Sequence, residues 1–484
     1  MNSGFRNSIV ARAYVLTMAV LAVGMGSLPA QSKVAWWMTT ESLTHKLSAQ
    51  PELDTEPVAA GASAADLTLD SSTVFQTMLG MGASLEASTC SNFWKMLPKD
   101  QELLMAKLVD PEAGIGMNLM RICIGSSDFT GDPWYSYNDL DAGKSDTGLR
   151  RFTIRKDKAY ILPVLRLALR KNPALLFFAS PWSPPGWMKT SGSMIGGSLL
   201  PQYYPVYADY FVRFIKSYQA EGIPIYAVTV QNEPGVDRQH EKDPKWFYPS
   251  CHWTGEQERD FIRDHLGPAF RKAGLKTKIW CYDHNYNVTA QGADAGLPHP
   301  RTILTDGRAA AFTDGVGFHG YVGNPEGMST FHAEFPHTPI HFTEGSVFGF
   351  DGAGQLLDRL RHWASSYNAW VTMLDEAGKP NNGPFPATHA IVKLNTKTLQ
   401  PEYLLEYYVY GQFMKFVARG AVRIGSQCSR PGLKQVAFRN PDGKLVLVLV
   451  HEGTEETGFG VQASNQRFTA RVPGKSINTF VWAP

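Results

Sequence analysis

The most constraining feature of this sequence is an apolar run that ends in polar residues, at positions 225–234 (IYAVTVQNEP). Its first part is rich in β-branched residues, as is typical of a buried strand. The carboxylate of Glu233 is costly to bury without a partner, and Pro234 ends the strand and begins a loop. We therefore predict that Glu233 stands at the carboxyl end of a parallel strand, where the catalytic residues of α/β barrels collect.

A second short run, residues 339–345 (PIHFTEG), ends in the same way with Glu344. Two strands that each deliver a glutamate to one rim predict a paired-carboxylate site. Glycoside hydrolysis needs such a pair, because one carboxyl protonates the leaving oxygen while the other attacks the anomeric carbon or activates water. A lone glutamate at a strand end is usually a surface charge, so it is the pair, with the N-E-P context of Glu233, that favours catalysis.

The charge balance excludes several classes of partner. A formal net charge of +2 at pH 7 gives no electrostatic case for nucleic acid or for an anionic membrane surface. The five cysteines form no C-x-x-C pair, so they predict neither a metal site nor a disulfide framework, and at most one or two disulfides. We expect no metal and no organic cofactor. Aromatic residues make up 12% of the chain, which suits sugar stacking as well as core packing.

Residues 1–30 are typical of an export signal. Arg6 and Arg12 form a basic start, residues 13–23 an apolar core, and Ala30 offers a small residue for cleavage. The alternative is an uncleaved anchor helix, but the apolar run is short for a membrane span. No other segment approaches that length, so we expect an exported protein, periplasmic or secreted, without stable membrane insertion.

Beyond residue 75, strand-like and helix-like segments alternate, which predicts an α/β fold with a parallel sheet. Eight strands close a barrel, so we predict a (β/α)8 TIM barrel over residues 76–417. Glu233 then follows the fourth strand and Glu344 the seventh. The expected strands are residues 75–84, 118–124, 174–180, 225–231, 277–282, 316–319, 339–343 and 369–374, and the expected helices are residues 100–109, 160–170, 204–221, 256–273 and 404–417.

The two ends of the chain differ from the middle. Residues 418–484 contain strand-like runs separated by turn signals and no helix, which indicates an all-β module. The predicted strands there are 436–438, 445–450, 467–470 and 479–482. Residues 34–75 supply strands at 34–40 and 67–70, with a loop between at 46–65. We therefore predict a β-sandwich domain formed by both chain termini.

Several longer motifs now suggest a family. They are residues 36–40 (WWMTT), 80–83 (GMGA), 121–129 (RICIGSSDF), 180–190 (SPWSPPGWMKT), 229–234 (TVQNEP) and 341–344 (HFTE). In these motifs the chain resembles glycoside hydrolase family 30, the family of glucosylceramidase, from residue 34 to residue 484. The resemblance implies a (β/α)8 barrel with a β-sandwich and hydrolysis with retention at a β-linked sugar.

The resemblance also implies roles for single residues. Glu233 matches the family's general acid/base, Glu344 its nucleophile, and Asn232 the residue that binds the sugar 2-hydroxyl. The residues that match the first sugar subsite are Arg121, Asp128, Trp182, Tyr321 and Trp370.

Elementary chemistry sets requirements on both carboxylates. Glu344 must stay ionised to attack, so it needs donors, for which Arg121 and Tyr321 are candidates. Glu233 must hold a proton, so we expect its pKa to be raised by the neighbouring carboxylate and by partial burial.

Each binding residue also has a structural alternative. Arg121 could form a structural ion pair, Asp128 could cap a loop or helix, Trp182 and Trp370 could be core residues, and Tyr321 could be a loop aromatic. Asp283 and His284, after the fifth strand, could equally bind sugar or hold a loop.

Two departures from the family pattern leave the aglycone open. Gly345-Ser346 replaces an Ala-Cys pair, and Gly320 replaces an aromatic residue, a loss that we expect to open space near the cleft. Our first hypothesis is a retaining β-glycosidase of glucosylceramidase type that hydrolyses β-glucosidic bonds of a glycolipid or glucan. The alternative is an endo-β-1,6-glucanase on the same scaffold. A non-catalytic carbohydrate-binding protein is a third possibility, against which the two glutamates count.

Overall fold

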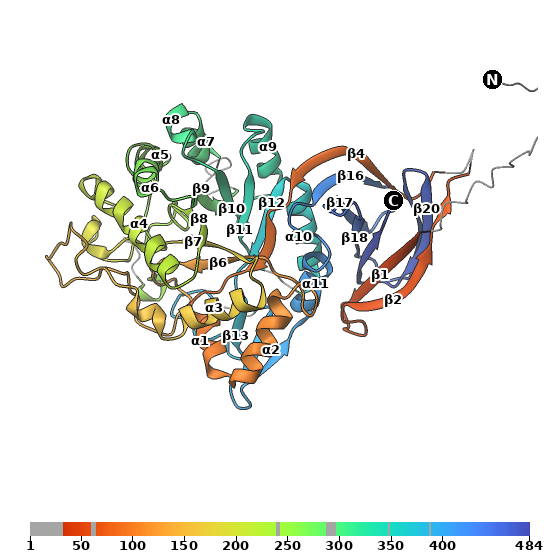
Figure 1. Cartoon of the computed structure of the whole chain (residues 1–484), viewed down its shortest axis with the longest axis horizontal. Helices are drawn as coiled ribbons and strands as arrows, with labels where there is room; N and C mark the ends of the chain where they lie inside the picture. Colours follow the sequence, from red (N-terminus) through yellow and green to blue (C-terminus); the bar gives the residue numbers. More distant parts are fainter. Residues whose placement is uncertain (1–31, 60–63, 239–242, 287–296, 347–348, 387–388) are drawn as a thin grey trace, which may run out of the picture. The chain divides into compact units, whose positions relative to one another are not determined.

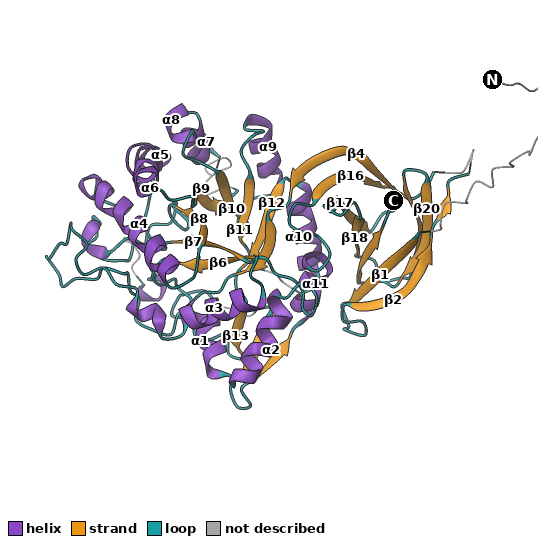
Figure 2. Cartoon of the chain, in the orientation of Figure 1, coloured by secondary structure: helices purple, strands orange, loops and turns teal. Residues whose placement is uncertain are grey.

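The computed structural model describes residues 32–59, 64–238, 243–286, 297–346, 349–386 and 389–484. The predicted export signal, residues 1–30, lies outside the described residues. Within Ser32–Pro484, Figure 1 shows a ring of strands surrounded by helices and, beside it, a group of strands drawn from both ends of the chain. Figure 2 shows the same division by secondary structure.

Eight parallel strands form the barrel in the order β5-β12-β11-β10-β9-β8-β7-β6. A parallel bridge between Ser84 and Arg121 joins its two ends. Gly82 lies so close to β6 that a Cβ there would be 2.1 Å from the carbonyl oxygen of Leu119, which explains the glycine-rich first strand. The strands are β5 Gly80–Ala83, β6 Leu119–Cys123, β7 Leu176–Ser180, β8 Ile225–Thr229, β9 Lys278–Asn285, β10 Gly315–His319, β11 Ile340–Glu344 and β12 Ala364–Ala369. The predicted barrel is confirmed.

The helices pack an apolar face on this sheet. On α4, Tyr207, Phe211, Phe214 and Tyr218 are all buried at helical spacing. The α-helices are α1 Ala87–Lys95, α2 Pro98–Val109, α3 Ile161–Lys171, α4 Tyr204–Ala220, α5 Gly255–Phe261, α6 Gly267–Ala273, α7 Pro298–Leu304, α8 Gly307–Ala310, α9 Glu326–Glu334, α10 Asp351–Arg361 and α11 Leu405–Met414. Short helices are η1 Arg155–Lys158, η2 Gly186–Met188, η3 Pro201–Tyr203, η4 Pro244–Trp246 and the π-helical η5 Ile262–Leu266, which joins α5 to α6.

The predicted eighth strand, residues 369–374, was wrong. The eighth barrel strand is β12 (ASSYNA), in which Tyr367 is the one large side chain and the other residues are small or polar, yet all are buried, so the pattern of apolar residues did not reveal it. The apolar segment that was chosen instead contains β13 Met373–Asp375, which forms a separate three-stranded sheet with β14 Val392–Asn395 and β15 Gln400–Tyr403.

Ten strands form the sandwich in the order β2-β1-β21-β18-β17-β16-β4-β19-β20-β3. The first and last strands of the described chain, β1 and β21, pair antiparallel, so both termini build this domain as predicted. The strands are β1 Lys33–Thr40, β2 Ser48–Asp54, β3 Glu56–Pro57, β4 Leu67–Thr77, β16 Val422–Cys428, β17 Leu433–Arg439, β18 Leu445–His451, β19 Thr457–Ala463, β20 Gln466–Val472 and β21 Ser476–Trp482.

Two expectations for this part of the chain were wrong. The predicted loop at 46–65 contains β2 and β3, which pair at the sheet's edges, where exposed polar side chains are tolerated. The predicted strand 75–84 is divided between the end of β4 and the barrel strand β5. Strands β16 and β19 went unpredicted. All five cysteines are free, and none of the described helices is long and apolar enough to span a membrane.

Candidate active site

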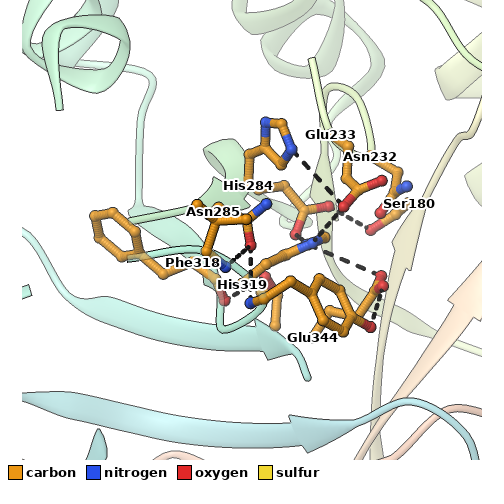
Figure 3. Close-up of polar contacts among 12 residues, drawn as sticks. Ser180, Asn232, Glu233, His284, Asn285, Phe318, His319 and Glu344 are labelled. Atoms are coloured by element: carbon orange, nitrogen blue, oxygen red, sulfur yellow. Dashed lines mark hydrogen bonds and ion pairs between the residues drawn. The ribbon is translucent and has the colours of Figure 1, made fainter. Parts of the chain in front are cut away.

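The polar side chains of the site converge from the carboxyl ends of five barrel strands (Figure 3). Glu344 and His319 are the last residues of β11 and β10. Asn232 and Glu233 follow β8, Arg121 lies on β6, and Asp283 lies on β9. The structure thus brings both predicted glutamates to one rim, as expected for a barrel enzyme.

Two donors hold the carboxylate of Glu344. A guanidinium nitrogen of Arg121 donates to one oxygen, and the hydroxyl of Tyr321 donates to the other at 2.8 Å. Arg121 is fully buried, so its charge acts on Glu344 with little screening by water. The ring of Tyr321 is 42% exposed even though its hydroxyl reaches into the site. This arrangement orients the carboxylate of Glu344 toward its role as a nucleophile.

Asp283 orients Arg121 from below. Its Oδ2 accepts from the guanidinium at 2.9 Å, from Ser180 at 3.0 Å and from Thr229 at 2.7 Å. Although burial opposes ionisation, the charge of Arg121 and the hydrogen bond from His319 hold the pKa of Asp283 well below its usual range. The sequence left open whether Asp283 binds sugar or has a structural role. Its contacts with Arg121, Ser180 and Thr229 give it the structural role.

A β-bulge turns Asp283 into the site. The register of β9 with β10 shifts between Gly317 and Phe318, and Asp283 has a φ of +63°. Bulges beside active sites commonly redirect a side chain in this way. Gly317 is required opposite the bulge, because a Cβ there would be 3.1 Å from the Cα of Asp283. No pattern of residues predicts this bulge.

Glu233 is held by its backbone and by two histidines. Its φ is +52°, and its amide donates to the carbonyl of Asp283 at 3.0 Å. Oε1 of Glu233 lies 3.4 Å from Nδ1 of His319 and 3.7 Å from Nε2 of His284. A left-handed backbone at a glutamate is strained, and such strain gathers at functional sites.

The expectation that the pKa of Glu233 is raised was wrong for the site without substrate. Burial raises the pKa, but the hydrogen bond from His319 and the charges of His284, His319 and Arg121 outweigh it, so the pKa is lowered. The expected rise in pKa rested on the neighbouring carboxylate of Glu344 and on burial, and it left out the effect of the two histidines.

His319 is the functional residue that sequence reasoning missed. It is completely buried, and its Nε2 lies 3.0 Å from Oδ1 of Asp283. Burial lowers its pKa, yet the carboxylates of Glu344, Asp283 and Glu233 raise it to about 9. His319 is therefore an imidazolium at neutral pH, and Asp283, His319 and Glu233 form one connected chain. The sequence signal that could have identified His319 is its position at the end of the predicted sixth strand.

The spacing of the two glutamates fits one mechanism. An oxygen of Glu233 and an oxygen of Glu344 lie within 4.8 Å of each other. Carboxyl groups about 5–5.5 Å apart are typical of retaining glycosidases, whereas inverting enzymes need about 6.5–9.5 Å to admit a water. The same atoms with His319 could geometrically hold a metal ion, which would have to displace the proton on His319.

The walls of the site are aromatic. Trp182 and Trp370 lie with ring centroids 5.1 Å apart, and Arg121 sits 4.8 Å from the Trp182 ring. Both tryptophans belong to a buried cluster and also line a cavity of about 540 Å³ together with Glu233 and Glu344. Trp182 and Trp370 therefore pack in the core and line the site at the same time.

Asp128 lines the same cavity. Burial first, then the charges of Glu344 and Glu233, raise its pKa to about 8. At neutral pH its carboxyl is therefore largely protonated, so it can donate as well as accept a hydrogen bond to a sugar hydroxyl. His284 lines the cavity too, which places it at the site but leaves its role a prediction.

The expectation that Gly320 opens space near the cleft was wrong. A Cβ at Gly320 would lie 2.5 Å from Nη2 of Arg359 and 2.8 Å from Phe342, so the position faces the packing between β11 and α10. Ser346, by contrast, does line the cavity. Of the two departures from the family pattern, only the one after Glu344 faces the cavity.

The charge of His319 predicts a pH effect on stability. Its pKa rises from 6.5 to about 9 on folding, so its stabilisation is fully present below pH 6.5 and is lost as the pH rises through about 9. We expect urea denaturation to show a free energy of unfolding that falls over this range. His319→Gln should flatten this fall relative to the wild type; parallel profiles for the two proteins would show that His319 is not charged in the native state.

Comparisons with known proteins agree with this geometry. Two family models match, the glycosyl hydrolase family 30 TIM-barrel domain over residues 78–417 and the glycosyl hydrolase family 30 beta sandwich domain over residues 420–480. An endo-1,6-beta-D-glucanase of Neurospora crassa is 32% identical over 428 residues, which cover 84% of this chain and 85% of the relative. The lysosomal acid glucosylceramidase of Mus musculus is 27% identical over 445 residues, covering 86% and 83%.

Among solved structures, an endo-beta1,6-glucanase is 31% identical, with a TM-score of 0.82 over 93% of this chain and 100% of its own. The similarity therefore extends through both domains and includes the barrel rim that carries the two glutamates. The chain belongs to glycoside hydrolase family 30.

Proposed function

We propose that this glycoside hydrolase cleaves β-glucosidic bonds by a double displacement with retention of configuration. Glu344 attacks the anomeric carbon, while Glu233 protonates the leaving oxygen and later activates the water that hydrolyses the glycosyl-enzyme. The observation that supports this assignment best is the spacing of the two carboxylates, which have oxygens within 4.8 Å of each other, together with the donation of Arg121 and Tyr321 to Glu344.

The Glu233–His319 pair supplies the proton. The two groups together hold one proton at neutral pH, and it resides on His319 in the free site. As Glu344 bonds to the sugar, its negative charge disappears, which lowers the proton affinity of the pair. The proton then passes through Glu233 to the departing oxygen, since only Glu233 borders the cavity.

Asn232 positions the sugar. Its Oδ1 accepts from Arg121 at 2.8 Å, which directs its amide nitrogen toward the cavity beside Glu344. An NH₂ group there can donate to the 2-hydroxyl, an interaction that strengthens in the transition state. Asp128, Trp182 and Trp370 enclose the remainder of the sugar ring.

The substrate we favour is a β-1,6-linked glucan. The sequence relative at 32% identity and the solved structure at 31% identity are both endo-1,6-glucanases. Glucosylceramide is a second candidate, because Val236, Val322 and Phe385 give the cavity beyond Glu233 an apolar wall. The signal predicted in residues 1–30 would place either activity outside the cytoplasm.

Product analysis on two substrates in parallel tests this assignment. We expect linear β-1,6-glucan to yield short oligosaccharides at a kcat/KM well above that for glucosylceramide in detergent micelles. Glu344→Gln serves as the control for background hydrolysis. Free glucose from the lipid with no product from the polymer would reverse the order of the two candidates.

A further inference from the structure

A second cavity lies on the same rim of the barrel as the catalytic cavity. It has a volume of about 630 Å³ and contains none of the catalytic residues. Its wall includes three aromatic side chains, two carboxylates and one amine, namely Trp134, Trp187, Tyr203, Asp139, Asp141 and Lys144.

Two loops are shared by both cavities. The loop after β6 places Asp128 and Phe129 on the catalytic cavity and Trp134 and Asp139 on the second one. The segment between β7 and α4 also reaches both cavities: Trp182 lines the catalytic cavity, and Trp187 and Tyr203 line the second cavity. Trp134 packs against the aromatic cluster that contains Trp182, so one set of aromatic side chains reaches both cavities.

The rings of the second cavity are fixed and partly open. The indole of Trp187 donates to the carbonyl and to the side-chain oxygen of Asn138, at 3.0 Å each. Tyr203 packs edge-on against it, with centroids 5.1 Å apart and an interplanar angle of 76°. Both rings are only half-buried. Rigid, accessible rings lose little conformational entropy when a ligand packs on them.

Polar groups around the rings suit hydroxyls. Trp134 contributes its ring to the cavity wall, with its indole N–H covered. Asp139 and Asp141 offer acceptors, and Lys144 pairs with Asp141 at 2.6 Å. Two carboxylates against one ammonium disfavour an anionic ligand. A neutral, hydroxyl-rich ligand fits this set.

We propose that the second cavity is an outer binding site for neutral β-glucan, which holds glucosyl units remote from the bond being cleaved. The inference rests on the proposed function for its choice of glucan. Contacts at this site raise affinity for the polymer without touching the reacting atoms, so they lower KM and leave the chemical step unchanged.

The test removes the more peripheral ring. Tyr203→Ala is compared with Tyr203→Phe, which keeps the ring, and with Trp94→Ala, which removes a half-exposed ring on α1 away from both cavities. For Tyr203→Ala we expect KM on β-1,6-glucan to rise about tenfold, a loss of roughly 1.4 kcal/mol. Its kcat/KM on an aryl β-glucoside should stay at the wild-type value, which also shows that the variant folds. Both control variants should match the wild type on both substrates.

Affinity electrophoresis in gels containing β-1,6-glucan, with each protein carrying Glu344→Gln, separates the outer site from the proposed function, because it measures binding without turnover. Retardation that is lost in Tyr203→Ala and kept in Trp94→Ala supports the outer site even where the wild type cleaves no glucan, a result that would contradict the proposed function alone. Equal retardation and equal KM for Tyr203→Ala and the wild type would overturn the outer site.

Discussion

Replacing Glu344 with glutamine is expected to lower kcat on glucan and on aryl β-glucosides by roughly 10⁴-fold or more, the scale on which removal of a nucleophile acts. The amide cannot form the glycosyl ester, yet it has nearly the same shape: its carbonyl oxygen can still accept from Arg121, and its NH₂ group can donate to the Tyr321 hydroxyl. Sugar binding should therefore persist. Steady-state kinetics with calorimetric titration of a glucoside separates the two properties.

Glu326→Gln is the matched control, since it makes the same chemical change at an exposed position in the first turn of α9. It should leave kcat within twofold of the wild type. Activity of Glu344→Gln near the wild-type value would remove Glu344 from the chemistry, whereas loss of binding together with turnover would indicate a damaged fold instead.

Glu233→Ala is expected to have the second-largest effect, and the effect should depend on the leaving group. General acid catalysis contributes about 10²–10⁴-fold, so hydrolysis of glucan should fall by that factor. A dinitrophenyl glucoside needs no proton for departure, so formation of its glycosyl-enzyme should be affected much less. Rapid-quench kinetics on this substrate should show a burst, because the intermediate accumulates once no base activates water.

The same variant also tests the role of His319. Without Glu233, the pKa of His319 loses one of the three carboxylates that raise it, although Asp283 and Glu344 remain. The imidazolium is 3.9 Å from Glu344 and does not line the cavity, so it should not replace Glu233 as the acid. An equal fall in rate on glucan and on the dinitrophenyl glucoside would contradict the acid/base assignment.

Much of the scaffold could be predicted from sequence because strands such as β8 and β11 are short, buried, β-type runs with a carboxylate at or just after their carboxyl end. That pattern has a single physical solution in a barrel, with the polar residue at the rim. Strand β12 was not predicted because, apart from Tyr367, its residues are small or polar, and their burial depends on neighbouring strands that the sequence does not display. Edge strands β2 and β3 were not predicted because half-exposed strands need few apolar residues.

The predicted site residues converge, but what fixes them could not be foreseen. Glu233, Glu344 and Arg121 lie in motifs, so they could be named. The bulge that turns Asp283 toward Arg121 and the imidazolium of His319 arise from contacts between strands that are distant in sequence. The sign of the pKa shift at Glu233 depends on those contacts, so the shift expected from the sequence had the opposite sign.

The measurement that tests the paired-carboxylate mechanism most directly is the product formed by Glu233→Ala from a dinitrophenyl glucoside in the presence of azide. Azide needs no base and can occupy the space left by the missing carboxyl, opposite the ester on Glu344. The mechanism predicts that azide raises kcat and that NMR identifies a glucosyl azide of the β configuration. An α-glucosyl azide, or a rate that azide leaves unchanged, would contradict it.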